Sequence, residues 1–255
     1  MPNSKNKELQ ISYLTLRKAI GWLGMLLPFA LLIGNYVINN SNILNNSWFL
    51  NTDCNGPYVP NDSYKNSISH YYYSTVGELF TGTMGSVALF LFCYKGHPKR
   101  RGETWFSDNL MANLAGAFAM GVVVFPVSSE HCITDNMRSF LSSQNTSYIH
   151  FSFAALFFIS LALMSIINFR RTATVKDFGK GSNNKVYLWC GIAILICLFI
   201  IFIYNAFLYG KFPGLDSIHP VFVLEAFALL AFGFSWLTKG KIDLAYIPKK
   251  LKIKK

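Results

Sequence analysis

The chain has 255 residues, of which 52% are hydrophobic and only 14% are charged, and its mean hydropathy is +0.33. A soluble domain carries roughly 25% charged residues, so this composition excludes an ordinary soluble globular protein. The formal net charge of +11 does not indicate a nucleic-acid partner, because the basic residues gather in alternate loops between apolar segments.

Six apolar segments predict spanning helices, since a helix needs about 20 mostly apolar residues to cross the hydrocarbon core of a bilayer. In chain order they are 19–38, 76–94, 109–127, 149–169, 187–209 and 219–238. The first has a basic flank but ends in GNYVINN rather than in a small-residue cleavage site, which favours a retained span over a signal peptide. The sequence therefore predicts an all-α, polytopic integral membrane protein with six transmembrane helices in a single domain, 1–255.

The distribution of lysine and arginine predicts the orientation of these spans. Twenty of the 23 basic residues lie in the two terminal tails and in the loops 95–108 and 170–186, while Lys65, Arg138 and Lys211 fall in the alternate loops. Basic residues near span ends stay on the cytoplasmic side. We therefore expect both termini to be cytoplasmic, in a plasma or inner membrane, and the tail KIDLAYIPKKLKIKK to contact anionic inner-leaflet lipid.

The first outer loop, 39–75, is long and rich in Asn, Ser, Pro and Tyr, which predicts a cap over the outer end of the helices. Cys54 lies in this loop and Cys132 lies in the second outer loop, and no other cysteine falls in an outer loop. In an oxidising compartment the two can form a disulfide. Two unpaired thiols are the alternative, because sequence alone does not fix connectivity.

Small residues recur at four-residue spacing in the second and third predicted spans. This spacing lets helix backbones approach closely in a membrane, where apolar surface alone does not drive helices together. It predicts packing faces at three pairs: Gly82 and Ser86, Ala112 and Gly116, and Ala117 and Gly121.

Ionisable side chains in and near the predicted spans gather toward the outer boundary. Glu78 lies near the outer end of the second span, His150 starts the fourth, and His219 and Glu225 lie at the start of the sixth. The inner halves of the spans contain neither an acid nor a histidine. Because charged groups in hydrocarbon normally face the bundle interior and find partners, we expect these four side chains to form an outer polar site, with His70 as a further ligand-binding candidate.

Three functions fit such a site. The leading hypothesis is the binding of a lipid headgroup or small polar ligand from the outer side, for transport, sensing or lipid handling. The first alternative is a membrane-embedded lipid hydrolase, with zinc as its metal. It has no HExxH, GxSxG or Walker motif to support it, and His219 and Glu225 are six residues apart, about 240° around one helix. The second alternative is a non-catalytic scaffold or assembly subunit, so enzymatic activity is left open.

Four stretches give the chain a resemblance to a known family. They are ISHYYY before the second span, NLAGAFAMGVVVFP in the third, IHFSFAALFFISLALMSIINF in the fourth and LEAFALLAFGFSWLTKG in the sixth. Over about residues 65–240 the chain resembles the DRAM and Frag-type six-helix membrane proteins, a family that includes uncharacterised bacterial relatives.

The resemblance implies six helices with cytoplasmic termini, and a link to lipid handling, GPI-lipid remodelling or autophagy regulation as in some eukaryotic members. Its matching polar positions are His150 and Glu225. Where the family reads Ile-Ser-Asp before the second span, this chain has Ile68-Ser69-His70, so any role of that acid does not carry over to His70.

Overall fold

The computed structural model describes residues 4–40, 65–74, 76–96, 104–127, 143–173 and 182–252, and within these ranges the chain forms helices and no strands. The long helices are α1 (Ser4–Asn40), α2 (Gly77–Cys93), α3 (Asp108–Val124), α4 (Ser143–Leu163), α6 (Ser182–Ile203) and α8 (Pro220–Lys252). The all-α prediction is confirmed, and one long helix lies at each of the six predicted spans.

Length and hydropathy divide these helices into two groups. In the described part of the chain, four stretches are long and apolar enough to cross a membrane: Leu14–Ile38, Asn145–Phe169, Asn184–Leu208 and Pro220–Gly240. α2 and α3 are apolar but shorter, with 17 residues each. Four membrane-compatible helices are therefore established, and a total of six spans stays a prediction.

Short elements modify the ends of the long helices. A 3₁₀-helix, η2 (Ser69–Tyr73), precedes α2, and the four-residue helix α7 (Pro213–Asp216) precedes α8. α4 continues as the π-helix η3 (Met164–Phe169) and then as α5 (Arg170–Ala173), while α6 ends in the π-helix η4 (Tyr204–Leu208). π-helical turns inside α-helices often mark functional positions, and η3 places Ser165 and Asn168 in the buried interior.

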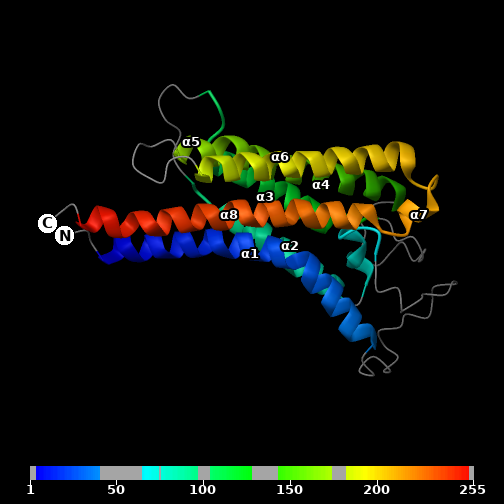
Figure 1. Ribbon diagram of the computed structural model, residues 1–255. Coiled ribbons are helices and arrows are strands. Elements are labelled where there is room, and N and C mark those ends of the chain that lie inside the picture. The colour runs from blue at the N-terminus through cyan, green and yellow to red at the C-terminus, as the bar shows by residue number, and fades with distance from the viewer. Residues whose placement is uncertain are drawn as a thin grey trace.

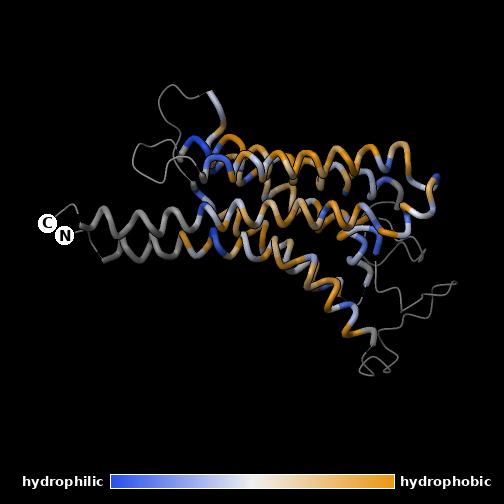
Figure 2. Tube along the Cα trace, in the orientation of Figure 1, coloured by the Kyte–Doolittle hydropathy of each residue, from blue (hydrophilic) through white to orange (hydrophobic). Residues whose placement is uncertain are grey.

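The helices form one elongated bundle in which α1 and α8 run side by side in opposite directions (Figure 1). α8 also packs on α6, α6 packs on α4, and α3 lies between α2 and α4. The second half of α1 turns away from α8 toward α2 (Figure 1), and Pro28, which removes one helical hydrogen bond, lies inside this helix. Figure 2 shows apolar residues along the middle of the bundle and hydrophilic residues toward both of its ends.

The predicted packing faces are present in part. A β-carbon built on Gly116 would lie 3.0 Å from the carbonyl oxygen of Ala88, so α3 and α2 approach closely there. Gly121 is similarly close to Phe153 of α4. Gly82 has open space beside it and Ala117 is exposed, so these two do not form helix contacts among the described residues.

Candidate functional site

The segment before α2 is tied to the start of α8 by three hydrogen bonds. The Asn66 carbonyl oxygen accepts from the Phe222 N–H at 3.0 Å, and the Asn66 side-chain oxygen lies 2.7 Å from Nδ1 of His219. The Ile68 N–H donates to Oε2 of Glu225 at 2.7 Å. Residues 66–68 therefore pack against the first turns of α8, where His219 and Glu225 both bond to this short segment.

The helical spacing argument for His219 and Glu225 is wrong, because His219 is not part of the helix. α8 begins at Pro220, a residue whose fixed φ suits the first helical position. His219 itself has φ +49, a left-handed conformation that non-glycine residues seldom adopt. This backbone turns the imidazole toward Asn66, so both side chains reach the same segment despite being six residues apart.

His150, on α4, is the most deeply buried of the predicted site residues, with 1% of its surface exposed. Its Nδ1 lies 2.7 Å from the carbonyl oxygen of Phe125 at the end of α3. Because a carbonyl oxygen only accepts, the proton of this bond is on Nδ1, and in the uncharged ring Nε2 is then an acceptor. Nε2 is buried and has no hydrogen-bond partner among the described residues.

His70, in η2, joins the same end of the bundle. Its Nδ1 lies 2.6 Å from Oγ of Ser67, and its backbone N–H donates to that oxygen at 3.3 Å. The imidazole also lies close enough to His150 for the two rings to interact electrostatically. His70 of η2 and His150 of α4 are therefore within electrostatic range of each other.

A small cavity lies beside Glu225. Its volume is about 30 Å³, and its walls come from α1, η2, α2, α3, α4 and α8, including Ser69, Val122 and Ala154. Ala154 is one helical turn from His150 on α4, which places this histidine near the cavity wall. A volume of this size has room for one or two water-sized groups, and Glu225 is the one carboxyl group that faces it.

Other predicted site residues have different positions. Glu78 is exposed in the first turn of α2, so the structure does not bring it into the buried group of His150 and Glu225. Cys54 and Cys132 lie outside the described residues, and most of the 39–75 loop does too. Within the ranges that are described, no three His, Cys, Asp or Glu side chains are grouped as ligands for a metal ion.

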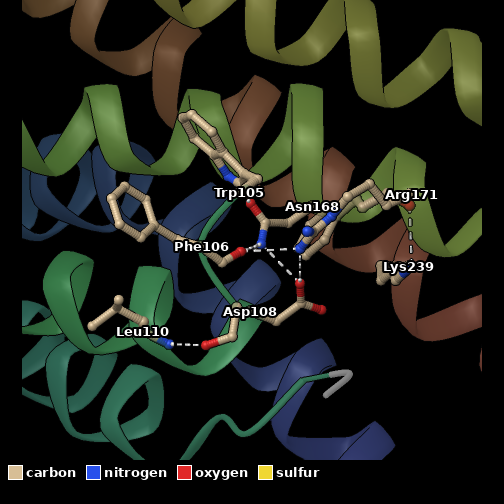
Figure 3. A network of polar contacts seen from close by, with 9 residues as sticks. Trp105, Phe106, Asp108, Leu110, Asn168, Arg171 and Lys239 are labelled. Carbon is tan, nitrogen blue, oxygen red and sulfur yellow. Dashed lines mark hydrogen bonds and ion pairs between the residues drawn. The ribbon is translucent and has the colours of Figure 1, made fainter. Parts of the chain in front are cut away.

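A second polar network lies at the other end of the bundle, around Asp108 (Figure 3). Oδ1 of Asp108 accepts from Nδ2 of Asn168 at 2.8 Å and from Nη2 of Arg171 at 3.3 Å. Nε1 of Trp105 donates to Oδ1 of Asn168 at 3.1 Å. Asp108 and Asn168 are fully buried, so the network links the start of α3 to η3 and α5 inside the protein.

Local structure explains why Asp108 occupies this place. Ser107 caps α3, with its Oγ accepting the Leu110 N–H at 3.2 Å, and an acidic residue in the first helical turn is favoured by the helix dipole. Gly96 packs against the carboxyl group with φ +59, and a β-carbon there would lie 2.1 Å from Cβ of Asp108. Only glycine fits both this conformation and this contact.

Two buried cations extend the network. Nζ of Lys239 on α8 donates to the Phe169 carbonyl oxygen at 3.3 Å and lies 5.4 Å from the centre of the Phe169 ring. The guanidinium of Arg17 on α1 lies 5.3 Å from the ring centre of Tyr94. Aromatic faces attract cations electrostatically, so both charges are held against rings inside the bundle, with 1% of Arg17 and 3% of Lys239 exposed.

The buried acid at the basic end of the bundle, Asp108, was not among the predicted site residues. Asp108 is one residue outside the third predicted span, and tertiary packing covers it. The sequence carries a clue in the acid-containing SDNL stretch, a capped helix start immediately before an apolar run.

Comparison with known proteins gives no relative with which these two sites can be compared. No family model, no curated protein and no solved structure matches the chain. Its resemblance to the DRAM and Frag-type membrane proteins therefore stays a prediction.

Proposed function

We propose that this is an integral membrane protein that binds the polar part of a lipid, or a small polar ligand, at the end of the bundle formed by η2 and the start of α8. The observation that carries the proposal is a small cavity lined by Glu225, together with a buried His150 Nε2, one helical turn from the cavity-lining Ala154, that has no hydrogen-bond partner among the described residues. Buried polar atoms are nearly always paired, so an unpaired one indicates a missing ligand or water.

The chemistry of the site favours a ligand that carries hydrogen-bond donors. Glu225 offers carboxyl oxygens, of which Oε2 accepts one backbone N–H, and His150 offers an acceptor nitrogen. Acceptors of these two kinds are satisfied by N–H or O–H groups, as in a primary ammonium or a hydroxyl. A quaternary ammonium has no such donor and would leave both groups unpaired.

The sizes of the cavity beside Glu225 and of a neighbouring groove on α4 favour a lipid as the ligand. The cavity beside Glu225 takes only a water-sized group, such as the tip of a headgroup. At the same level of α4, an open groove of about 250 Å³ is lined by Tyr148, Ile149, Ser152, Phe153 and Leu156. These side chains are mostly apolar, so an acyl chain can lie along α4 while its headgroup reaches toward the histidines.

Retention of phosphatidylethanolamine over phosphatidylcholine tests this proposal. Both lipids are zwitterionic, but only the first has ammonium N–H donors. We expect the purified protein to retain phosphatidylethanolamine preferentially, as measured by mass spectrometry of lipids released from the protein. The Glu225→Gln and His150→Ala variants are expected to reduce this preference by about tenfold or more, the effect of losing one hydrogen bond to a charged or buried group.

Glu78→Gln is the matched control, because it removes the same charge from an exposed position at the start of α2. We expect this variant to keep the wild-type preference. Equal retention of the two lipids by the wild-type protein, or a preference that survives both Glu225→Gln and His150→Ala, would contradict the proposal and favour the scaffold alternative.

The proposal includes six spanning helices with both termini and the basic tail on the cytoplasmic side. α2 and α3 have 17 residues, about 25 Å of helix, and a mismatch of a few ångströms with the bilayer is accommodated at modest cost. We expect a reporter fused after Lys255 to be active only in the cytoplasm, and a reporter inserted between 128 and 142 to be active only outside. A reporter at either site that is active on the other side would overturn this orientation.

A further inference from the structure

Ser69 lines the small cavity beside Glu225. Of the described residues that form the cavity walls, Ser69 and Glu225 alone are polar, and the others, such as Leu27, Phe80 and Leu229, are apolar. A group that enters the cavity therefore meets one serine and one glutamate in otherwise apolar surroundings.

The Ser69 side chain is buried and lacks a partner. The residue is 7% exposed. In the same segment, the hydroxyls of Ser67 and Ser74 bond to His70 and to the Tyr71 carbonyl oxygen. The Ser69 hydroxyl, in contrast, makes no hydrogen bond with the residues that the structure describes. Because buried polar groups are nearly always paired, this hydroxyl indicates a missing ligand or water.

The residues before Ser69 determine its position relative to Glu225. The Ile68 N–H donates to Oε2 of Glu225 at 2.7 Å, and the Asn66 carbonyl oxygen accepts from the Phe222 N–H at 3.0 Å. Ser69 follows directly as the first residue of η2. These two bonds hold the serine next to the carboxyl group, so one small group in the cavity can contact both residues.

We infer that Ser69 is a third hydrogen-bond partner of the ligand and makes the site selective for a primary ammonium group. The inference rests on the proposed function, in which Glu225 and His150 accept two N–H donors of the ligand. A primary ammonium has three N–H groups, and the Ser69 hydroxyl oxygen accepts the third. Each N-methyl group replaces one N–H, so a single methyl group already leaves one acceptor unpaired.

Size alone does not exclude the first methyl group. The cavity of about 30 Å³ has room for one or two water-sized groups, and a nitrogen with one methyl group is two such groups. Weaker binding of a monomethylated ligand would therefore report a lost hydrogen bond rather than a lack of space.

One competing explanation is a water molecule that bridges Ser69 and Glu225. The cavity is large enough for it, and it would pair the Ser69 hydroxyl without any effect on which ligand binds. The experiment must therefore measure the selectivity of the site, because a bound water and a bound ligand both stabilise the fold.

Competition between phosphatidylethanolamine and its N-monomethyl derivative makes this measurement, because the two lipids have the same charge and differ by one methyl group. We expect the wild-type protein to retain the unmethylated lipid about tenfold better, the effect of one hydrogen bond to a charged group. Mass spectrometry of the released lipids gives this ratio. Ser69→Ala is expected to retain the two lipids equally and still to prefer phosphatidylethanolamine over phosphatidylcholine, because Glu225 and His150 are intact.

Two variants control for size and for the segment itself. Ser69→Cys keeps a side chain of similar shape but replaces the hydroxyl with a much weaker acceptor, so we expect it to lose the discrimination as Ser69→Ala does. A filter by size alone would leave the discrimination of Ser69→Cys intact. Ser74→Ala makes the same change at a serine that bonds to the Tyr71 carbonyl oxygen and does not line the cavity, and it should discriminate as the wild type does.

A soluble pair of ligands identifies the source of the ammonium group. Ethanolamine and N-methylethanolamine repeat the comparison, with the rise in the thermal unfolding midpoint of the detergent-solubilised protein as the measurement. A methyl effect with the lipids alone assigns a lipid headgroup, and a methyl effect with the soluble pair assigns a site that takes a free amine.

Two results would overturn the inference and leave the proposed function intact. The first is a wild-type protein that prefers phosphatidylethanolamine over phosphatidylcholine but binds the monomethylated lipid equally well. The second is a pair of variants, Ser69→Ala and Ser69→Cys, that discriminate as the wild type does, which would assign a bridging water to Ser69. Equal retention of all three lipids by the wild type would instead contradict the proposed function itself.

Discussion

Replacing Asp108 with alanine is expected to cost about 3–5 kcal/mol of unfolding free energy, the range measured when one partner of a buried charge pair is removed. Asp108 is fully buried and accepts from Asn168 and Arg171. Its loss removes the attraction of this carboxylate for Lys239 and removes the 2.8 Å acceptor of the Asn168 amide, whose Nδ2 also donates to the Phe106 carbonyl oxygen at 3.3 Å. Because Arg171 is partly exposed and can turn toward water, we expect a value near the lower limit of that range.

A denaturant titration of the detergent-solubilised protein, followed by tryptophan fluorescence, measures this loss. Asp108→Asn separates charge from shape, since asparagine keeps an acceptor oxygen for Asn168 and removes only the charge. We expect the unfolding free energy of Asp108→Asn to lie between those of Asp108→Ala and the wild-type protein. Glu78→Ala, which removes an exposed acid from the first turn of α2, should change the free energy of unfolding by no more than about 0.5 kcal/mol. Equal losses for Asp108→Ala and Glu78→Ala would show that the Asp108 network does not stabilise the fold.

The helices were predictable from the sequence because run length and hydropathy decide them locally. Each of the six apolar segments corresponds to one long helix, with ends that differ mainly where a helix continues beyond the apolar part. α1 begins at Ser4 and α8 ends at Lys252, well outside the predicted spans. Backbone hydrogen bonding continues into polar sequence, and α8 runs past Gly240 and Pro248, whereas hydropathy reports only the apolar part of a helix.

The polar residues near the cavity and at the start of α8 were predictable only in part. His150 and Glu225 are buried or half-buried near the cavity, as expected of ionisable groups in spanning helices. The bonds that position His219 and Glu225 come from the backbone of 66–68, which has no periodic pattern to show where it will fold. Glu78 lies at the same end of the bundle but is exposed. Which side of a helix is buried depends on its rotation about its own axis, and the short helix α2 is too uniformly apolar for its sequence to predict that side.

The Asp108 network was missed because its parts have ordinary local explanations. Arg17, Arg171 and Lys239 are counted among basic residues that set orientation, and Asp108 is a normal first-turn acid. These residues come from four different elements, which meet only in the folded bundle. The π-helical turn η3 adds a rotation that no hydropathy pattern predicts, and it places Asn168 against Asp108.

The contact between α1 and α8 is expected to depend on Gly233, because the two backbones meet there. A β-carbon on Gly233 would lie 2.5 Å from the carbonyl oxygen of Gly21 and 2.8 Å from Cβ of Met25. Gly21 has as little space on its side of the contact, since a β-carbon added to it would lie 3.0 Å from the Gly233 carbonyl oxygen. Backbone atoms cannot turn aside as a side chain can, so any substituent must push the two helices apart.

We therefore expect Gly233→Ala to destabilise the protein by about 1–3 kcal/mol, as overpacking of a core does, and Gly233→Leu to yield little folded protein by size-exclusion chromatography in detergent. Gly82→Ala is the matched control, because it makes the same substitution in a helix with nothing within 4 Å of the new carbon. It should be neutral or stabilising by up to about 1 kcal/mol, the helix-propensity gain of alanine over glycine. If Gly233→Ala and Gly82→Ala unfolded at the same denaturant concentration, the two helices would not be packed backbone to backbone. Their close contact also keeps Arg17 of α1 within electrostatic range of Lys239 of α8, so separation of these helices is expected to weaken that interaction as well.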